Sequence, residues 1–274
     1  LEARKNNESL PEDGYGGEYV IEWAKEMPAG LALEEIITWG CEFAKSDQQD
    51  TLSELGIYFD TWFSEKSMID NGEIDRVLAN LAEKGMAYEK DGATWLSSVE
   101  FGDDKDRVLI KSDGEYTYLT PDVAYHRNKF ERSDWLINVW GADHHGYIAR
   151  MKAAMQALGY DSDALTVQVT QLVKLLRAGE EVKLSKRQGD IIELRSIIEE
   201  IGADATRFMY LLQSVDSKQT FDLELAASQG MDNPVYYVQM AYARLCSIER
   251  NANEHGFDFE ILPIDQLSVL GHQR

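Results

Sequence analysis

Short apolar runs alternate with helical repeats between Trp135 and Gln213, and this alternation constrains the fold more than any other feature of the chain. The run WLINVWG is nearly continuous in apolar residues, which is typical of a strand buried in a parallel sheet. It ends at Gly141, and the periodicity of YIARMKAAMQALG is then helical. One face of this expected helix carries Ile148, Met151, Met155 and Leu158. The segment therefore predicts a strand, a glycine turn and a helix.

The same alternation continues toward Gln213. LTVQVTQLVKLL is a second strand candidate, RAGEE is a turn candidate, and the runs IIELRSIIEEIG and DATRFMYLLQS are helical. Since strands and helices alternate along this region, we expect an α/β fold built on a parallel sheet.

The regions on either side have other patterns. Residues 1–50 show helical periodicity, and GIYFDTWFSE predicts an extended segment before a helix that ends at Gly85. The pair Asp113-Gly114 between two strand-like runs predicts the turn of a small inserted β-hairpin. Beyond Phe221 the pattern is wholly helical, and Asn233-Pro234 suits the start of a helix.

The charge of the chain argues against one class of function. With 49 acidic and 27 basic residues, the formal net charge is -22. Nonspecific binding to nucleic acid needs a broad basic face, so no DNA partner is expected and any nucleic-acid contact must be local. No apolar run approaches the roughly 18 residues of a membrane span, and no signal-peptide pattern opens the sequence. We therefore expect a cytoplasmic protein with no membrane partner.

The motif GADHHGY lies where the first expected strand gives way to a helix. Ligands of open α/β sheets collect at the carboxyl ends of strands, and Gly141 would let a nucleotide approach the backbone. Asp143 could bind ribose hydroxyls while His144 and His145 face phosphate. A metal site is one alternative, but so short a stretch offers few convergent ligands and no cysteine. A purely structural turn is another.

The motif YTYLTPDVAYH places Tyr118 and Asp122 four residues apart, hence on one side of the segment if it is helical. An aromatic ring beside a carboxylate suits a guanidinium, which needs a bidentate acceptor and a stacking surface. The pair could therefore select arginine. The alternative is an ordinary helix surface, on which this spacing is common.

The motif VKLSKRQGD concentrates cations in an otherwise acidic chain. On a glycine-terminated loop, Lys183, Ser185 and Lys186 could reach a triphosphate and neutralise the charge that develops on departing pyrophosphate. Read alone, the motif is more typical of a solvated surface loop.

In this order and separation, the three motifs resemble the arginyl-tRNA synthetases, a family of class I aminoacyl-tRNA synthetases. The resemblance covers nearly the whole chain and includes PEDGYGGEYV, GIYFDTWFSE, GADATRF and DNPVYYVQMAYARLCSI. VKLSKRQGD is similar to the family's KMSKS loop, with Leu184 in place of methionine and Arg187 in place of the final serine.

The resemblance implies a fold and a division into domains. The fold would be the second half of a Rossmann-like parallel sheet with a small α+β insertion, followed by the start of an all-helical domain. Residues 1–134 would be a partial catalytic domain with the connective insertion and the arginine-pocket segment. Residues 135–220 would be the second half of the nucleotide-binding domain, and residues 221–274 would begin the anticodon-binding domain.

It also implies a reaction and its partners. ATP, accompanied by Mg²⁺ without a dedicated protein site, would activate arginine as arginyl-adenylate, and the acyl group would pass to tRNA(Arg). By the same resemblance, Tyr118 and Asp122 contact the arginine side chain. On the helical segment, Tyr237, Gln239 and Arg244 would pack or contact tRNA.

One departure from the family pattern leaves a second interpretation open. The family's His-x-Gly-His signature, which holds the triphosphate, is not present in these residues. We therefore expect the 274-residue chain alone to be inactive. The alternatives are a noncatalytic synthetase-like fragment or paralogue that binds tRNA or protein, and another adenylate-forming nucleotidyltransferase of the same superfamily.

Overall fold

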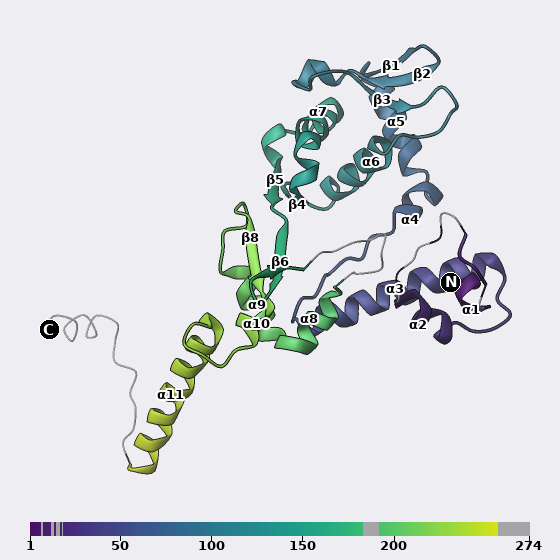
Figure 1. The fold of residues 1–274 in the computed structure, drawn as a ribbon. Coiled ribbons are helices and arrows are strands. Elements are labelled where there is room, and N and C mark those ends of the chain that lie inside the picture. Colours follow the sequence, from purple (N-terminus) through teal and green to yellow (C-terminus); the bar gives the residue numbers. More distant parts are fainter. Residues whose placement is uncertain (7, 12–13, 15–16, 18, 183–191, 257–274) are drawn as a thin grey trace, which may run out of the picture. The chain divides into compact units, whose positions relative to one another are not determined.

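The structure is a computed structural model that describes every residue except 7, 12–13, 15–16, 18, 183–191 and 257–274. The chain divides into two compact units that interleave in sequence (Figure 1). The central unit comprises Tyr58–Val173 and Gln213–Gln219. The flanking unit comprises Leu1–Ile57, Lys174–Leu212 and Thr220–Arg274. The sequence predicts a division into functional regions at 1–134, 135–220 and 221–274. The two compact units are defined by contacts and do not test that division, so it stays a prediction.

The central unit combines four helices with two small sheets among its described residues. Its helices are α4 (Glu65–Asp70), α5 (Glu73–Glu83), α6 (Leu119–Phe130) and α7 (Ile148–Leu158). Its 3₁₀ segments are η1 (Ser98–Phe101), η2 (Ala142–Tyr147) and η3 (Ser162–Ala164). Its strands are β1 (Ala87–Lys90), β2 (Ala93–Leu96), β3 (Arg107–Ile110), β4 (Leu136–Gly141) and β5 (Leu165–Thr170).

The strand and the helix expected after Trp135 are β4 and α7, so the mixed α/β fold with a parallel sheet is confirmed. Strands β4 and β5 are parallel, in register from Leu136 opposite Leu165 to Gly141 opposite Thr170. Both carboxyl ends therefore lie at one edge of the sheet. The apolar face of α7 is buried in the same core as these strands and α6. This core fixes where the residues that follow β4 are held.

The antiparallel sheet has the order β1-β2-β3, and its hairpin turn is Asp91-Gly92. Both turn residues have positive φ, +54° and +75°, as a tight two-residue turn requires. The predicted turn at Asp113-Gly114 also forms, with the amide of Lys111 donating to the Glu115 carbonyl. The strand expected after it is reduced to a single bridge at Tyr116, because the chain enters α6 directly afterwards.

The flanking unit is mainly helical. Its described helices are α1 (Glu2–Lys5), α2 (Tyr19–Glu26), α3 (Leu33–Glu54), α8 (Leu194–Ile201), α9 (Ala203–Leu211), α10 (Leu223–Ala227) and α11 (Pro234–Glu254). Its strands β6 (Val173–Arg177), β7 (Glu180–Glu181) and β8 (Gln219–Asp222) form a sheet of order β7-β6-β8. The run LTVQVTQLVKLL, expected as one strand, is therefore two, since β5 and β6 pair in different sheets.

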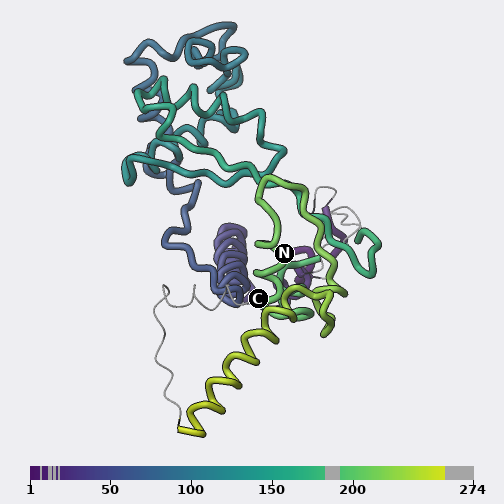
Figure 2. Tube along the Cα trace, turned by 90° about the vertical axis from the view of Figure 1, so that its left-hand side faces the viewer, coloured from purple at the N-terminus to yellow at the C-terminus, as the bar shows by residue number. Residues whose placement is uncertain are grey.

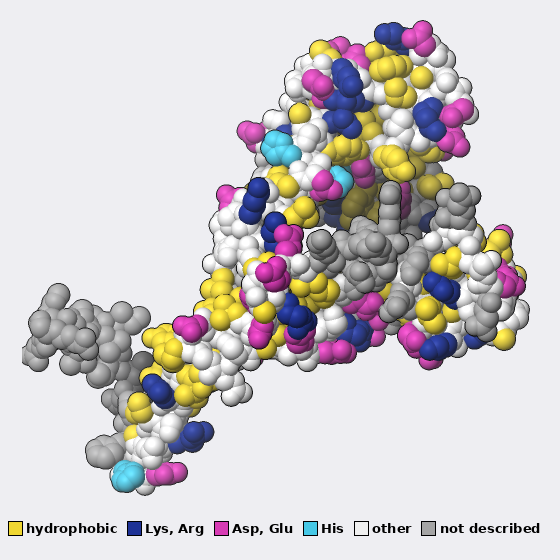
Figure 3. Space-filling view, in the orientation of Figure 1, with side chains coloured by type: hydrophobic (Ala, Val, Ile, Leu, Met, Phe, Trp, Pro, Cys, Tyr) yellow, Lys and Arg dark blue, Asp and Glu magenta, His cyan; other side chains and the backbone are white. Residues whose placement is uncertain are grey.

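The helix expected after Asn233-Pro234 is α11, which runs unbroken in Figure 2. The Asn233 side chain caps it by accepting from the amide of Val235 and donating to the carbonyls of Ala226 and Ser228. Pro234 occupies the first turn, where no amide hydrogen is needed. Apolar side chains are exposed along α11 (Figure 3), namely Val238, Tyr242, Leu245 and Ile248.

None of the described helices is both long and apolar enough to cross a membrane.

Candidate functional site

The candidate site lies in the central unit, where η2 follows the carboxyl end of β4 and meets the first turn of α6. Gly141 is the last residue of β4 and precedes η2. Its backbone is extended, with φ −66° and ψ 155°, so no left-handed conformation explains the glycine. A Cβ at this position would lie 2.6 Å from Oδ1 of Asp143. Any larger residue would therefore displace the exposed Asp143 carboxylate, which folds back over the strand end.

Asp122 and Tyr147 form the central contact of the site. Asp122 lies in the first turn of α6, and the hydroxyl of Tyr147 donates to its Oδ2 at 2.9 Å. Burial raises the pKa of the Asp122 carboxyl, while the Tyr147 hydroxyl, Lys129 and His144 oppose that rise. Burial and the Asp122 charge raise the pKa of Tyr147, so its hydroxyl stays a donor. Asp122 is thus a half-buried anion, suited to a cationic ligand.

Behind Asp122, α6 and β4 bury a neutral histidine and an amide. His126 and Asn138 are 3% and 6% exposed. Nδ1 of His126 lies 2.7 Å from the Asp122 carbonyl, and its Nε2 lies 2.6 Å from Nδ2 of Asn138. Burial, with a smaller effect of Lys129, lowers the pKa of His126 to about 4. The polar atoms of this layer are satisfied, and they hold the start of α6 against β4.

The Tyr118 side chain is 92% exposed at the N-cap of α6. The hydrogen bonds among the described residues include none from its hydroxyl. The tyrosine that contacts Asp122 is Tyr147, which is part of the GADHHGY motif but was not predicted as a site residue. A role for Tyr118 in holding a ligand stays a prediction.

The other residues of η2 are open to solvent. The side chains of Asp143 and His144 are 78% and 62% exposed, with 3.7 Å between the Asp143 carboxylate and Nε2 of His144. His145 is exposed as well. Among the described residues, no three His, Cys, Asp or Glu side chains are grouped so that they could hold a metal ion. Asp143, His144 and His145 are therefore exposed at the carboxyl edge of the sheet, and their role in binding a nucleotide stays a prediction.

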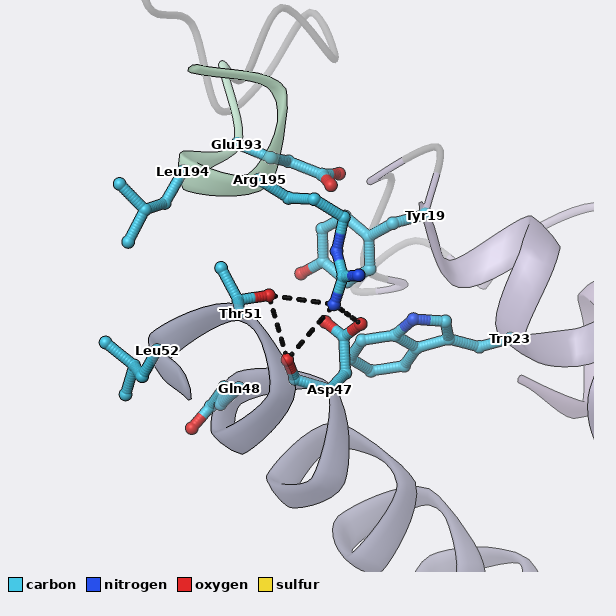
Figure 4. Close-up of a pocket in the computed structure, with 9 residues that line it drawn as sticks. All are labelled: Tyr19, Trp23, Asp47, Gln48, Thr51, Leu52, Glu193, Leu194 and Arg195. Atoms are coloured by element: carbon cyan, nitrogen blue, oxygen red, sulfur yellow. Dashed lines mark hydrogen bonds and ion pairs between the residues drawn. The ribbon is translucent and has the colours of Figure 1, made fainter. Parts of the chain in front are cut away.

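Lys183, Ser185 and Lys186 lie outside the described residues. The chain that resumes after them is attached by Arg195 on α8. Its Nη2 donates to Oδ1 of Asp47 at 2.9 Å and to Oγ1 of Thr51 at 2.8 Å, both on α3 (Figure 4). Sequence reasoning missed this contact because 148 residues separate Arg195 from Asp47.

This contact borders a cavity of about 320 Å³ within the flanking unit. Figure 4 shows side chains from α2, α3 and the start of α8 around it. Trp23 lines it from α2, where its ring packs against Phe43 of α3 at a centroid distance of 5.6 Å. The guanidinium of Arg195 is engaged with Asp47, so it presents no free cation to a ligand here.

On α11, the three predicted residues do not face one cavity. Tyr237 and Arg244, seven positions apart, line a cavity of about 400 Å³ with Met231. Gln239 lines two others, both of them with Asp204 and Val235. The structure thus brings Tyr237 and Arg244 together and separates Gln239 from them.

Solved structures that resemble this chain indicate its class. An arginyl-tRNA synthetase structure from Campylobacter jejuni is 35% identical with a TM-score of 0.82, and the match covers 98% of this chain and 63% of that one. The Thermus thermophilus arginyl-tRNA synthetase shares the fold at 18% identity, with a TM-score of 0.62 and coverage of 86% and 49%. The fold is that of the class I aminoacyl-tRNA synthetases.

Within that class, residues 34–253 match the family described as tRNA synthetases class I (R), catalytic domain. The chain belongs to this arginyl-tRNA synthetase family. The arginine–tRNA ligase of Anoxybacillus flavithermus is 49% identical over an alignment of 263 residues, with coverage of 92% of this chain and 47% of the relative. Arginine–tRNA ligase 1 of Halalkalibacterium halodurans is 48% identical, with coverage of 95% and 49%. The chain spans about half the length of the curated relatives it matches.

Proposed function

We propose that the full-length protein containing this chain is an arginine–tRNA ligase. It would activate arginine with ATP, release pyrophosphate, and transfer the arginyl group to a ribose hydroxyl of tRNA(Arg). Family membership supports this proposal, and the half-buried carboxylate of Asp122 is the structural observation that carries it. We also propose that the protein acts in the cytoplasm.

Asp122 would accept the guanidinium of arginine. A half-buried carboxylate is costly unless it is paired, and the two oxygens of a carboxylate match the two N–H groups of a guanidinium. The Tyr147 hydroxyl uses Oδ2 and fixes the side chain. Tyr118, at the N-cap of the same helix, would cover the ligand from the solvent side.

ATP would bind at the carboxyl edge of the parallel strands. Gly141 and Asp143 would meet the ribose, while His144 and His145 face phosphate. Lys183, Ser185 and Lys186 would stabilise the charge on the departing pyrophosphate. Magnesium would arrive bound to ATP, whose phosphate oxygens it prefers as ligands.

The tRNA would contact α11 through Tyr237 and Arg244, which share one cavity, and separately through Gln239. The net charge of -22 means that such contacts must be local rather than spread over the surface.

The test is arginylation by the full-length protein, comparing wild type with Asp122→Asn. The amide keeps the shape but removes the charge, and losing a charge-assisted hydrogen bond costs about 1.5–3 kcal/mol. We expect the KM for arginine to rise about ten-fold to a hundred-fold, with the KM for ATP little changed. Asp75→Asn is a matched control, since Asp75 accepts from the Tyr116 hydroxyl elsewhere in the central unit.

Lysine supplies a second control, because an ammonium cannot make the paired contacts of a guanidinium. It should be a poor substrate for both proteins. Equal effects of Asp122→Asn on arginine and ATP, or none on arginine, would remove Asp122 from the pocket. Absence of arginylation by the wild-type protein would reject the function itself and favour a noncatalytic binding protein.

A further inference from the structure

Lys129 places a half-buried ammonium seven residues after Asp122 on α6. Its Nζ donates to Oδ1 of Asn138 at 2.9 Å and lies 4.5 Å from the centre of the Tyr125 ring. The ion pairs formed by the described residues include none from Lys129. A buried cation without a contacting carboxylate is costly, so its charge depends on the nearest anion.

The hydrogen bonds around His126 determine its protonation. Its Nδ1 must donate, because its partner is the carbonyl oxygen of Asp122. Its Nε2 must accept, since Nδ2 of Asn138 donates to it at 2.6 Å and Nζ of Lys129 lies 3.4 Å away. The imidazole is therefore neutral, in agreement with its low pKa. Of the four polar residues Asp122, His126, Lys129 and Asn138, Lys129 therefore carries a positive charge and Asp122 a negative charge.

The charged groups near this pair come from several elements. Just beyond α6, Arg132 lowers the pKa of Lys129, whereas Asp122 raises it. From η2, His144 and the Tyr147 hydroxyl act on Asp122, and Arg150 of α7 lies over the Tyr147 ring at 4.8 Å.

Among the described residues, no charged group of β4, α4 or α5 contributes to the pKa shift of Asp122 or of Lys129. Strand β4 provides the neutral Asn138. On α5, Glu73 accepts from Asn128 and Asp75 accepts from Tyr116, so both carboxylates are engaged elsewhere. Burial dominates at Lys129 and lowers its pKa to about 8.

We propose that binding of a guanidinium at Asp122 is coupled to loss of a proton from Lys129, which makes Lys129 a charge-balancing, positioning residue of the arginine pocket. This inference rests on the proposed function, because it requires arginine to bind at Asp122. The proton passes to solvent buffer, and the lysine amine then keeps its hydrogen bond to Asn138.

The direction of the coupling follows from electrostatics. In the free protein the Asp122 charge favours the ammonium form of Lys129. A guanidinium bound at Asp122 offsets the field of that anion at Lys129, so the pKa of Lys129 falls. By linkage, arginine binds more tightly as the pH rises through the range in which free Lys129 loses its proton. Below that range the ammonium opposes the ligand.

The experiment is calorimetric titration of the full-length protein with arginine between pH 6.5 and 8.5, in buffers that differ in ionisation enthalpy. We expect the wild type to release protons and to bind arginine about three-fold to ten-fold more tightly at the upper pH, as for removal of a nearby charge in a partly buried site. Lys129→Met should bind tightly at every pH, and Lys129→Arg weakly at every pH. Neither should release the extra protons.

Lys66→Met is the matched control, because Lys66 is exposed in the same unit and pairs with Asp70. It should behave as wild type. The α-amino group of arginine contributes equally in all proteins, so differences between them report on Lys129. Equal proton release in wild type and in Lys129→Arg would overturn the proposal.

Two further outcomes keep the proposals distinct. If Lys129→Met does not fold, Lys129→Arg decides alone, since it retains the charge and cannot titrate in this range. If the wild type does not bind arginine, or if Asp122→Asn binds it equally well, the pocket assignment has failed, and the coupling fails with it. Binding that needs Asp122 but releases no extra protons rejects only the coupling.

Discussion

The Tyr147 hydroxyl donates a 2.9 Å hydrogen bond to Asp122 across 25 residues of sequence, and it joins η2 to the first turn of α6. The carboxylate that would recognise arginine is therefore held by the same segment that carries the nucleotide-binding candidates. Within the central unit, this contact links the amino-acid side of the proposed site to its ATP side.

Tyr147→Phe should weaken arginine binding without unfolding the protein. The hydroxyl lowers the pKa of Asp122 against the effect of burial, so its loss raises that pKa further. Loss of one hydrogen bond, about 1 kcal/mol, should raise the KM for arginine roughly five-fold. Since the Asp122 carboxylate would then protonate at a higher pH, the pH below which arginine affinity falls should also be higher than in the wild type.

The measurement is the KM for arginine as a function of pH. Tyr116→Phe is a close control, because Tyr116 also donates to a carboxylate, that of Asp75 at 3.0 Å, away from the site. If the KM for arginine begins to rise in acid at the same pH in Tyr147→Phe and in the wild type, the hydroxyl does not affect the pKa of Asp122.

The pattern of apolar residues in the sequence predicted several individual helices and strands of this fold. The strand β4 and the helices α7 and α11 could be read from the sequence because apolar residues form a short run in β4 and recur at helical spacing in α7 and α11, although α11 buries only Val235 among the described residues. The boundary between β5 and β6 could not, since strand-favouring residues continue on both sides of Gln171 and Leu172 while the sheet partner changes. Which strand pairs with which is a tertiary property.

The site was predictable only as separate motifs. Asp122 and Gly141 could be chosen from local chemistry, but the side chain that contacts Asp122 depends on how η2 is oriented after β4. The burial of His126 against Asn138 has the same origin, because a polar residue gives no periodic signal that it is buried. Contacts of this kind need the packed structure.

Lys186→Ala in the full-length protein should slow adenylation. Lys186 lies outside the described residues, so this prediction rests on the KLSKR motif alone. A contact to charge that develops in the transition state is worth roughly 2–4 kcal/mol, hence a fall in kcat of about thirty-fold or more. Arginine-dependent pyrophosphate exchange measures the step, and the KM for arginine should change little. If Lys186→Ala kept the kcat of the wild-type protein, this lysine would not act on the triphosphate.

Arg107→Met should destabilise the small antiparallel sheet. Asp103 is 7% exposed and accepts two hydrogen bonds of 2.7 Å from Arg107. Removing one partner leaves a buried charge, at a cost of about 3 kcal/mol. The guanidinium also holds the pKa of Asp103 well below its usual range.

The pH dependence gives the sign of this effect. A depressed pKa stabilises the folded state above the ordinary aspartate pKa, and that contribution is lost as the pH falls toward the native value. The variant should therefore be less stable at neutral pH, and the gap to wild type should narrow in acid. Denaturant unfolding at several pH values tests this, and a constant difference would contradict it.

Arg195 should couple energetically to α3 more strongly than an ordinary surface pair. Its guanidinium bonds both Asp47 and Thr51, and its Nη1 lies 3.6 Å from Glu54. Because these three acceptors lie on one face of α3, they restrict the orientation of the Arg195 guanidinium. The contact therefore holds α8 against α3. Groups that share such a network have interaction energies of about 0.5–3 kcal/mol in double-mutant cycles.

The cycle combines Arg195→Met with Thr51→Val in the full-length protein and measures unfolding free energies. We expect a coupling of at least about 1 kcal/mol. The pair Arg177 and Glu200 is the internal comparison, because it is bidentate but more exposed, and exposed pairs contribute about 0.2–1 kcal/mol. If the Arg195 cycle couples no more strongly than the Arg177 cycle, then the packing of α8, rather than its arginine, is what attaches the segment after the KLSKR motif to α3.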